Sequence, residues 1–299
     1  MFQKNWPILL VDDEPDVLAV SRLAMRSFRV KDLPVELHTA SSKAEAIELL
    51  SGPLSGLVFP YIAIAFVDVV METDQAGLEL CEWIRETQRD GLTQLYIRTG
   101  QPGKAPERQV MERYGINGYF TKAELTEDKL YSLVQAGVRQ FDFMAMAMTV
   151  FNTIVHASAA TQSPEALTTL LNNVLTMMPL DSRGESSHPD SFDVQECILI
   201  GDQLKCGTLT AATARAERDR LVKLGLRPLG PNGDAVVEVG GTQLIKAAAT
   251  GTHDEAWHLG LFQSPPDGPS TMLLLSFLKT VATLYKRLEA PSREPTTAG

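Results

Sequence analysis

The first half of the chain alternates short apolar runs with amphipathic stretches. The apolar runs predict strands over residues 8–11, 35–39, 61–67, 94–99 and 118–121. Between and after them, apolar positions recur three and four apart, which predicts helices over residues 16–28, 42–50, 77–89, 105–114 and 126–141. Strands that alternate with helices are typical of a parallel sheet covered by helices. The pattern therefore predicts a doubly wound (βα)5 unit of the α/β class over residues 1–141.

Apolar positions at helical spacing continue beyond residue 141, through Met144, Met148, Phe151 and Val155. This predicts a helical linker over residues 142–162 that continues the fifth helix. Such a seam packs against another helix, either in the same chain or in a dimer partner. The alternative is a helix that lies on the core of its own domain, because flexible Met side chains fill irregular gaps.

The second half shows a different order of elements. Ser163 and Pro164 favour a helix start and a helix to about residue 178, and a polar loop over residues 179–190 follows. The pattern then predicts strands at 192–200 and 203–209, a helix at 211–224, strands at 235–239, 242–249 and 256–263, and a last helix at 270–288. This order predicts an α+β domain over residues 163–289, with a disordered tail over 290–299.

Length and composition narrow the classes of protein. A chain of 299 residues suits two domains, and a formal net charge of −10 disfavours binding to a nucleic-acid backbone.

The cysteines Cys81, Cys197 and Cys206 lack the spacing of metal or redox sites, which favours a reducing compartment and a role as buried apolar residues. The first apolar run ends at once in acidic residues, and no stretch is long enough to span a bilayer. We therefore expect a cytoplasmic protein without nucleic-acid or membrane partners.

Chemically suggestive residues follow the predicted strands of the first half. Asp12 and Asp13 follow the first strand, Asp68 follows the third, and Thr99 and Lys122 end the fourth and fifth. In a parallel sheet of order 2-1-3-4-5, ligands bind where the strand order reverses, which brings the three acids together. Crowded carboxylates ionise together when a cation shares the site, and their hard oxygens suit Mg²⁺. These residues predict transfer of a phosphoryl group to Asp68. Mg²⁺ and Lys122 would neutralise the charge on the transferred group, and Thr99 would donate a hydrogen bond to it.

The segments ILLVDDE, AFVDVVM, YIRTG and GYFTK carry a family resemblance. Residues 8 to about 141 resemble the CheY-like receiver domain of two-component response regulators. The resemblance implies that Asp13 binds Mg²⁺ directly, that Asp12 helps through water, and that the main-chain carbonyl of Val70 completes the metal site. It also implies that Asp68 accepts the phosphoryl group of a histidine kinase or phosphotransfer protein, and that Tyr119 is the switching aromatic residue. The alternative is a degenerate receiver that keeps the fold without phosphorylation.

Some residues depart from the usual receiver pattern. Glu72 and Ala123 stand where many receivers have proline, and Val70 replaces a polar side chain that helps to position hydrolytic water in relatives. We expect Val70 to slow self-dephosphorylation relative to a Val70→Asn variant. The segments VMETDQAGL, RTGQPGKAPER and TKAELTEDKL resemble a subgroup whose receiver precedes a domain of unknown function. In longer members, an HD-type cyclic-di-GMP phosphodiesterase or another output module follows that domain.

No catalytic motif is recognised in the second half, and the histidines His156, His188, His253 and His258 form no ligand pair. We therefore expect no enzyme activity beyond self-dephosphorylation. The first hypothesis is a response regulator whose phosphorylation switches a downstream protein partner or a homodimer through the linker and terminal helix. The alternative is a small-molecule sensor, because the second domain resembles GAF and PAS domains in element order. A hydrophobic cavity large enough for a metabolite in that domain would favour the sensor, and a filled core would favour the regulator. A hydrolase that uses Asp68 as its nucleophile is disfavoured, because no substrate site is evident.

Overall fold

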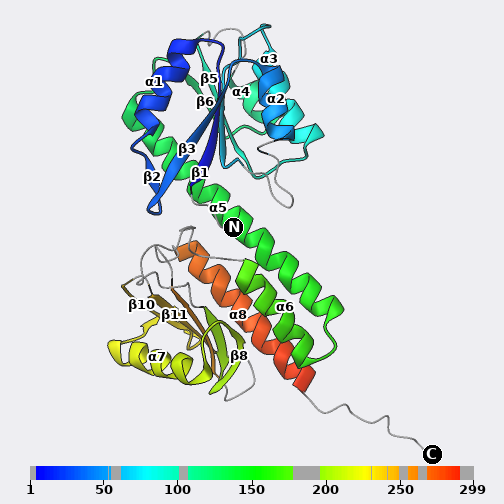
Figure 1. The fold of residues 1–299 in the computed structure, drawn as a ribbon, viewed down its shortest axis with the longest axis vertical. Coiled ribbons are helices and arrows are strands. Elements are labelled where there is room, and N and C mark those ends of the chain that lie inside the picture. The colour runs from blue at the N-terminus through cyan, green and yellow to red at the C-terminus, as the bar shows by residue number, and fades with distance from the viewer. Residues whose placement is uncertain are drawn as a thin grey trace, which may run out of the picture. The chain divides into compact units, whose positions relative to one another are not determined.

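The computed structural model describes residues 5–52, 54, 62–100, 107–177, 196–229, 231–240, 242–248, 255–261 and 268–289 (Figure 1). The chain divides into two compact units, Gln3–Ala145 and Met146–Gly299. Each unit is built around its own sheet. In the part of the chain that the structure describes, no helix is both long enough and apolar enough to cross a membrane.

The sheet of the first unit has the order β2-β3-β1-β4-β5-β6. Its strands are β1 (Trp6–Val11), β2 (Arg29–Val30), β3 (Leu33–Ala40), β4 (Ile64–Val67), β5 (Gln94–Thr99) and β6 (Gly118–Thr121). All neighbouring strands pair in parallel except β2 and β3, which form an antiparallel hairpin. Without β2, the remaining strands follow the order 2-1-3-4-5. The predicted α/β fold is confirmed.

Helices cover both faces of this sheet, as Figure 1 shows. They are α1 (Pro15–Met25), α2 (Lys43–Ser51), α3 (Ala76–Glu82), the π-helix η1 (Trp83–Thr87), α4 (Glu107–Tyr114) and α5 (Glu127–Ala160). Leu9 and Val11 of β1 join the core under α2, α3 and α4, whereas Ile8 and Leu10 join the core under α1 and α5. Every residue of β1 is buried, as expected for a parallel strand covered on both faces.

The structure differs from the predicted elements in three places of the first unit. β4 begins at Ile64, and residue 61 lies outside the described residues. The predicted helix 77–89 is divided into α3 and η1, where Arg85 donates to the carbonyls of Asp90 and Thr93 and so ties the last turn to the start of β5. The hairpin β2–β3 was not predicted. Its turn residues Lys31 and Asp32 both have positive φ, the conformation that matches the twist of a two-residue hairpin.

The second unit is an α+β fold, as predicted. Its antiparallel sheet has the order β8-β7-β12-β11-β10-β9. The elements are α6 (Pro164–Met177), β7 (Cys197–Ile200), β8 (Gln203–Gly207), α7 (Ala211–Leu224), β9 (Arg227–Pro228), β10 (Ala235–Val239), β11 (Thr242–Ala248), β12 (Glu255–Leu261) and α8 (Gly268–Glu289). The two-residue strand β9 was not predicted. The predicted loop 179–190 and tail 290–299 lie outside the described residues.

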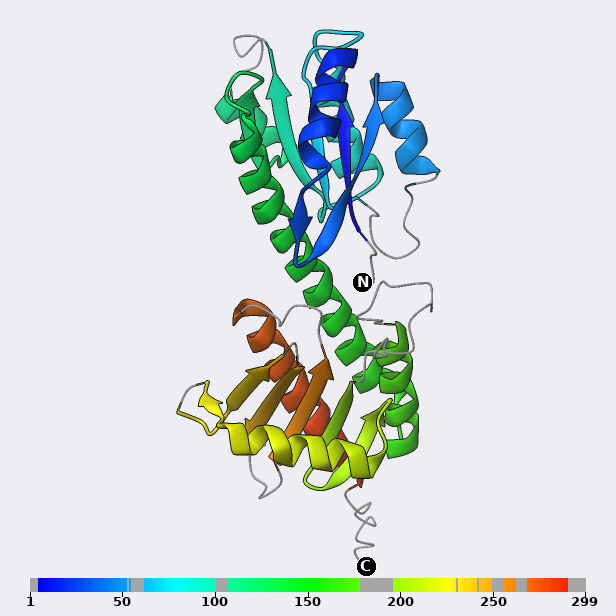
Figure 2. The same cartoon turned by 60° about the vertical axis from the view of Figure 1, so that its left-hand side comes forward.

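Two apolar layers fill this unit. One face of the sheet, with Ile198 and Ile245, packs against α6, α8 and the last turns of α5. The other face, with Leu199 and Leu244, packs against α7. Figure 2 shows α7 in yellow across one face of the sheet and α8 in orange to red on the other. The alternation of side chains along each strand supplies both layers.

Candidate functional site

Three carboxylates meet at the carboxyl ends of β1 and β4. Val11 lies opposite Val67 in the parallel pairing of these strands, so the residues that follow them, Asp12 and Asp68, become neighbours. One ligand oxygen each from Asp12, Asp13 and Asp68 lies within 4.8 Å of the others. Asp12 and Asp68 are buried, whereas Asp13 is exposed. Among the residues that the structure describes, this is the one group of acids, histidines and cysteines close enough to share an ion.

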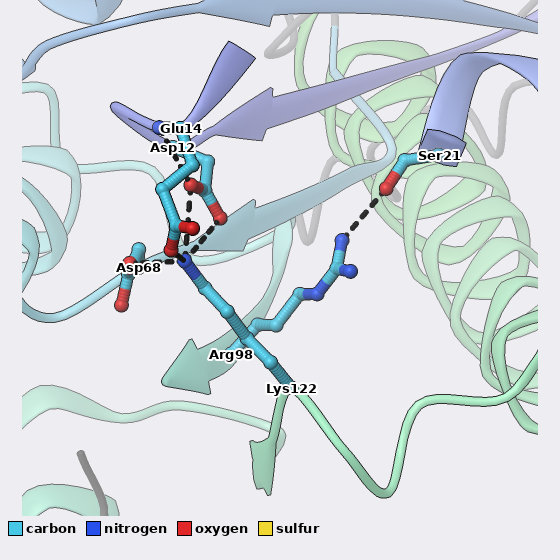
Figure 3. Close-up of polar contacts among 6 residues, drawn as sticks. All are labelled: Asp12, Glu14, Ser21, Asp68, Arg98 and Lys122. Atoms are coloured by element: carbon cyan, nitrogen blue, oxygen red, sulfur yellow. Dashed lines mark hydrogen bonds and ion pairs between the residues drawn. The ribbon is translucent and has the colours of Figure 1, made fainter. Parts of the chain in front are cut away.

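Lys122, which follows β6, bridges Asp12 and Asp68 (Figure 3). Its Nζ lies 2.9 Å from Oδ2 of Asp12, 2.7 Å from Oδ2 of Asp68 and 2.6 Å from Oε1 of Glu14. Burial by itself lowers the pKa of Lys122, but the hydrogen bonds to Asp68, Glu14 and Asp12 outweigh it and raise the pKa. The same contact lowers the pKa of Glu14. The site therefore contains a permanently charged ammonium group.

The surroundings of the Asp68 carboxyl group affect its pKa and the contacts of its two oxygens. Burial raises the pKa of Asp68, and the neighbouring charge of Asp12 adds to this effect, while hydrogen bonds from Lys122 and the backbone N–H of Val70 oppose it. Oδ2 contacts Lys122, whereas the buried Oδ1 has no hydrogen-bond partner within the described residues. A buried carboxylate oxygen without a partner is costly unless it serves a ligand or a reaction. Oδ1 is thus the free oxygen of the site.

This donor set fits a hard divalent cation. Magnesium prefers carboxylate oxygens from one or two residues together with water, and the exposed Asp13 leaves one side of the group open to solvent. The unpartnered Oδ1 of Asp68 supplies a buried acceptor on the same group. A cation would also relieve the repulsion among the three acids.

The backbone around Asp68 is packed tightly by the start of α3. A Cβ atom on Gly77 would lie 1.8 Å from the carbonyl oxygen of Asp68, so only glycine fits there. The N–H of Gly77 donates to the carbonyl of Val69 over 3.1 Å, which fixes the loop after β4. Glu72 belongs to the same loop, and its Oε1 accepts the backbone N–H of Lys43 at the first turn of α2. Glu72 thus caps a neighbouring helix.

Thr99 and Tyr119 lie on the adjoining strands. Thr99 ends β5 and is fully buried, and its carbonyl accepts the N–H of Lys122 over 2.8 Å. Tyr119 pairs with Ile97 across β5 and β6 and packs against the core under α2, α3 and α4. Burial raises the pKa of Tyr119, and its hydroxyl has no hydrogen-bond partner within the described residues.

Two neighbours of this site, Glu14 and Arg98, were missed in the sequence. Glu14 directly follows the acid pair, yet its contact with Lys122 depends on how the loop turns. Arg98 is buried within β5 and donates from Nη1 to Oγ of Ser21 over 2.7 Å. A positively charged residue inside the apolar strand QLYIRT was the signal that could have identified Arg98.

The remaining candidate residues of the sequence are cysteines and histidines. Cys81, Cys197 and Cys206 are buried, and burial raises the pKa of each thiol to about 12, which excludes a reactive thiolate. His258 is buried and pairs with Glu196 in the second unit, while His156 is exposed on α5. His188 and His253 lie outside the described residues.

Comparisons with known proteins add one sequence relative and several structures. No protein-family model matches the chain. The chain is 34% identical over 228 residues to the 3′3′-cGAMP-specific phosphodiesterase 2 of Vibrio cholerae, a match that covers 73% of this chain and 40% of the relative. The chain thus spans less than half the length of the curated relative it matches.

Solved structures similar to the chain include receiver domains. The signal receiver domain of an HD domain-containing protein from Pseudomonas fluorescens is 18% identical, with coverage of 48% of this chain and 93% of that chain and a TM-score of 0.37. The chemotaxis protein CheY4 of Vibrio cholerae is 20% identical, with coverage of 44% and 98% and a TM-score of 0.34. The sheet order and helix layers described above make the first unit a CheY-like receiver fold.

The sequence relative corrects one expectation. The prediction that the protein is not an enzyme is wrong, because the relative matched over 73% of this chain is named as a phosphodiesterase. The prediction rested on the absence of recognisable catalytic motifs. The absence of such motifs does not decide the activity of a chain that matches only 40% of the relative's length.

Proposed function

We propose that the chain is a response regulator whose first unit accepts a phosphoryl group on Asp68. The convergence of Asp12, Asp13, Asp68 and Lys122 at one edge of the sheet is the observation that carries this proposal. The donor would be a phosphohistidine of a histidine kinase or of a phosphotransfer protein, as the receiver resemblance implies. The functional layout would then be a receiver over residues 1–141, a helical linker over 142–162 and a GAF/PAS-like domain over 163–289.

The reaction follows from the chemistry of the side chains. A carboxylate oxygen of Asp68 attacks phosphorus, a P–O bond forms, the P–N bond to imidazole breaks, and the imidazole keeps the electron pair. Lys122 stabilises the negative charge on the transferred oxygens, and the hydroxyl of Thr99 donates a hydrogen bond to one of them. Mg²⁺ held by Asp12, Asp13, Asp68 and the carbonyl of Val70 would supply further charge neutralisation. Tyr119 would follow the movement of Thr99 and report the phosphorylated state to partners.

Acetyl phosphate with Mg²⁺ tests this proposal directly. We expect intact-mass measurement to show one added phosphoryl group on the wild-type chain and none on Asp68→Asn. Asp16→Asn is a matched control, because Asp16 is an exposed acid in the first turn of α1. Equal labelling of Asp68→Asn, or no labelling of the wild type, would reject the proposal.

The surface of α5 supports a second copy of this chain as one partner. Met148, Phe151 and Val155 follow each other three and four residues apart and are 44%, 66% and 45% exposed, while Val150 and Ala157 on the opposite side are buried in the core of the second unit. The segment 143–164 contains no Asp, Glu, Lys or Arg. Because each copy carries a net charge of −10, a neutral helical face is where two copies can approach with little repulsion.

The last helix takes no part in the proposed dimer. The sequence suggested an interface on both the linker and the terminal helix, but α8 buries its apolar stripe, including Leu274, Phe277 and Val281, against its own sheet. The proposed homodimer therefore rests on α5.

The sequence relative favours a second candidate function, in which this chain hydrolyses, or regulates the hydrolysis of, a cyclic dinucleotide. The supporting observation is 34% identity to a 3′3′-cGAMP-specific phosphodiesterase over 73% of the chain. Incubation of the chain with 3′3′-cGAMP and divalent metal, followed by chromatography of the nucleotides, tests catalysis by the chain itself. Linear product that is absent with heat-inactivated protein would establish it, and unchanged substrate would limit the chain to a regulatory role.

The alternative of a metabolite sensor depends on a cavity in the second unit. An open groove of about 520 Å³ lies between α7 and the sheet. Its cations are already paired, Arg218 with Asp202 and Lys246 with Glu255, and Trp257 is only 6% exposed. The packed apolar layers around it favour the regulator over the sensor.

A further inference from the structure

Arg98 is a buried cation that the chemistry of phosphoryl transfer does not by itself require. Side chains alternate along β5, so that Leu95 and Ile97 join the core under α2, α3 and α4, while Tyr96 joins the core under α1 and α5. Arg98 lies on the same face as Tyr96 and is only 9% exposed. Its guanidinium is therefore placed between the sheet and α1, on the opposite face from Thr99.

The contacts of Arg98 do not neutralise its charge locally. Nη1 donates to the neutral hydroxyl of Ser21, and Nε has no hydrogen-bond partner within the described residues. Figure 3 shows the guanidinium turned toward Ser21 and not into the group of carboxylates. A buried cation without a direct counter-ion is unfavourable unless more distant charges stabilise it. Asp12, Asp68 and Glu14 supply that attraction.

Arg98 contributes to the net charge of the acidic pocket. Four carboxylates, those of Asp12, Asp13, Glu14 and Asp68, face the two cations Lys122 and Arg98. The excess of two negative charges equals the charge that one divalent cation brings. Lys122 contacts three of the acids directly, whereas Arg98 acts through space from the α1 side. A cation at a fixed distance repels an added metal ion and attracts an added phosphoryl group.

We propose that Arg98 is a positioning residue that weakens the binding of divalent cations to the unphosphorylated pocket and stabilises the phosphorylated pocket. The hydrogen bond to Ser21 would hold the guanidinium at the distance where both effects operate. This inference rests on the proposed phosphorylation of Asp68. Arg98 would lower the affinity of the pocket for Mg²⁺ and raise its affinity for the phosphoryl group. A residue with a merely structural role would not change these two affinities in opposite directions.

Calorimetric titration of Arg98→Met with Mg²⁺, and then with beryllofluoride at saturating Mg²⁺, tests the proposal. We expect beryllofluoride, the phosphoryl analogue, to bind about ten-fold more weakly than to wild type, and Mg²⁺, whose double charge squares this factor, to bind roughly a hundred-fold more tightly. A ten-fold ratio is the size expected for unit charges roughly 10 Å apart at an effective dielectric constant of about 20. Arg98→Lys keeps the charge and should restore both affinities toward the wild-type values.

Arg22→Gln is the matched control, because Arg22 is an exposed arginine of the same helix as Ser21 and bonds to Thr39. It should change neither affinity. If Arg98→Met does not fold, as judged by circular dichroism, Arg98→Gln carries the same test, because its amide can still meet the Ser21 hydroxyl. Affinities that both fall, or both stay unchanged, would overturn the inference. A wild-type chain that binds neither Mg²⁺ nor beryllofluoride would instead reject the proposed function.

Discussion

Opposing interactions act on the carboxyl group of Asp68. Burial and the charge of Asp12 favour the protonated form, while Lys122 and the N–H of Val70 favour the carboxylate. Burial is the largest of these effects, so the pKa of Asp68 lies above its ordinary value. An acid whose pKa is raised by folding destabilises the fold once it ionises, at pH values above that raised pKa. Burying the ionised carboxylate of Asp68 therefore lowers the stability of the folded protein.

Asp68→Asn should therefore stabilise the protein at neutral pH. The substitution removes a buried negative charge that repels Asp12, and the gain should shrink as the pH falls toward the ordinary Asp pKa of about 4, where the wild-type carboxyl is protonated in both states. Thermal unfolding followed by circular dichroism at pH 7 and at low pH measures the difference. A Tm for Asp68→Asn below that of wild type at pH 7 would contradict the expected sign.

Gly77→Ala should damage both stability and phosphorylation. The added Cβ would collide with the backbone carbonyl of Asp68, which cannot move as a flexible side chain can. We expect a loss of roughly 1–3 kcal/mol in the free energy of unfolding, as for an overpacked core position, and slower labelling by acetyl phosphate.

Gly91→Ala provides the control for this substitution. A Cβ at Gly91 would meet no atom within 4 Å, so urea unfolding should show a change within about 0.5 kcal/mol. Similar losses for the two variants would argue against a specific contact between α3 and the acceptor loop.

At the scale of elements, α5 combines two kinds of surface in one helix of 34 residues. Its first turns bury Leu130, Val134 and Val138 in the core of the first unit. Its last turns bury Val150 and Ala157 in the core of the second unit and expose Phe151. A helix longer than one domain requires is suited to present a face to another helix.

Phe151→Lys should dissociate the proposed dimer. The substitution places a charge in the centre of the neutral apolar face, where two copies would bring like charges together. Light scattering after size-exclusion chromatography should show a lower mass than wild type at the same concentration. Leu23→Lys on α1 is the control, because Leu23 is also largely exposed (74%) yet lies on another helix, and the substitution should leave the mass unchanged. A monomeric wild type would remove α5 as a dimer interface.

At the level of the whole molecule, the chain contains two units, and each packs its own apolar layers on the two faces of its sheet. A ligand that binds a folded unit stabilises that unit in proportion to the logarithm of its concentration relative to Kd. Within the residues that the structure describes, the acids that could share Mg²⁺ belong to the first unit.

Differential scanning calorimetry should therefore resolve a transition that saturating Mg²⁺ moves upward and another that it leaves in place. At a concentration of about 100 times Kd, the stabilisation should approach about 2.7 kcal/mol. Asp13→Asn, which removes one proposed ligand and leaves the buried acids in place, should reduce the shift. An equal shift of the entire trace would indicate that the two units unfold as one.

The order of the elements could be predicted from the amino-acid sequence, and so could the meeting of Asp12, Asp68 and Lys122 at one edge of the sheet. The periodicity of apolar residues distinguishes strands from helices. Because parallel strands have their carboxyl ends at a common edge of the sheet, the proximity of Asp12, Asp68 and Lys122 could be predicted. The short strands β2 and β9 and the π-helix were missed, because two-residue pairings and a single altered turn leave no periodic signal. The absence of a motif likewise misled the expectation about enzyme activity.

Which surfaces meet could be seen in the folded chain but not in its sequence. An apolar stripe shows that a helix face is to be covered, but not by what, so the buried stripe of α8 and the exposed stripe of α5 looked alike in the sequence. The contact of Glu14 with Lys122, the position of Arg98 beside Ser21 and the close approach of Gly77 to Asp68 depend on loop paths and helix placement. These arise from packing between segments far apart in the chain, which local patterns do not encode.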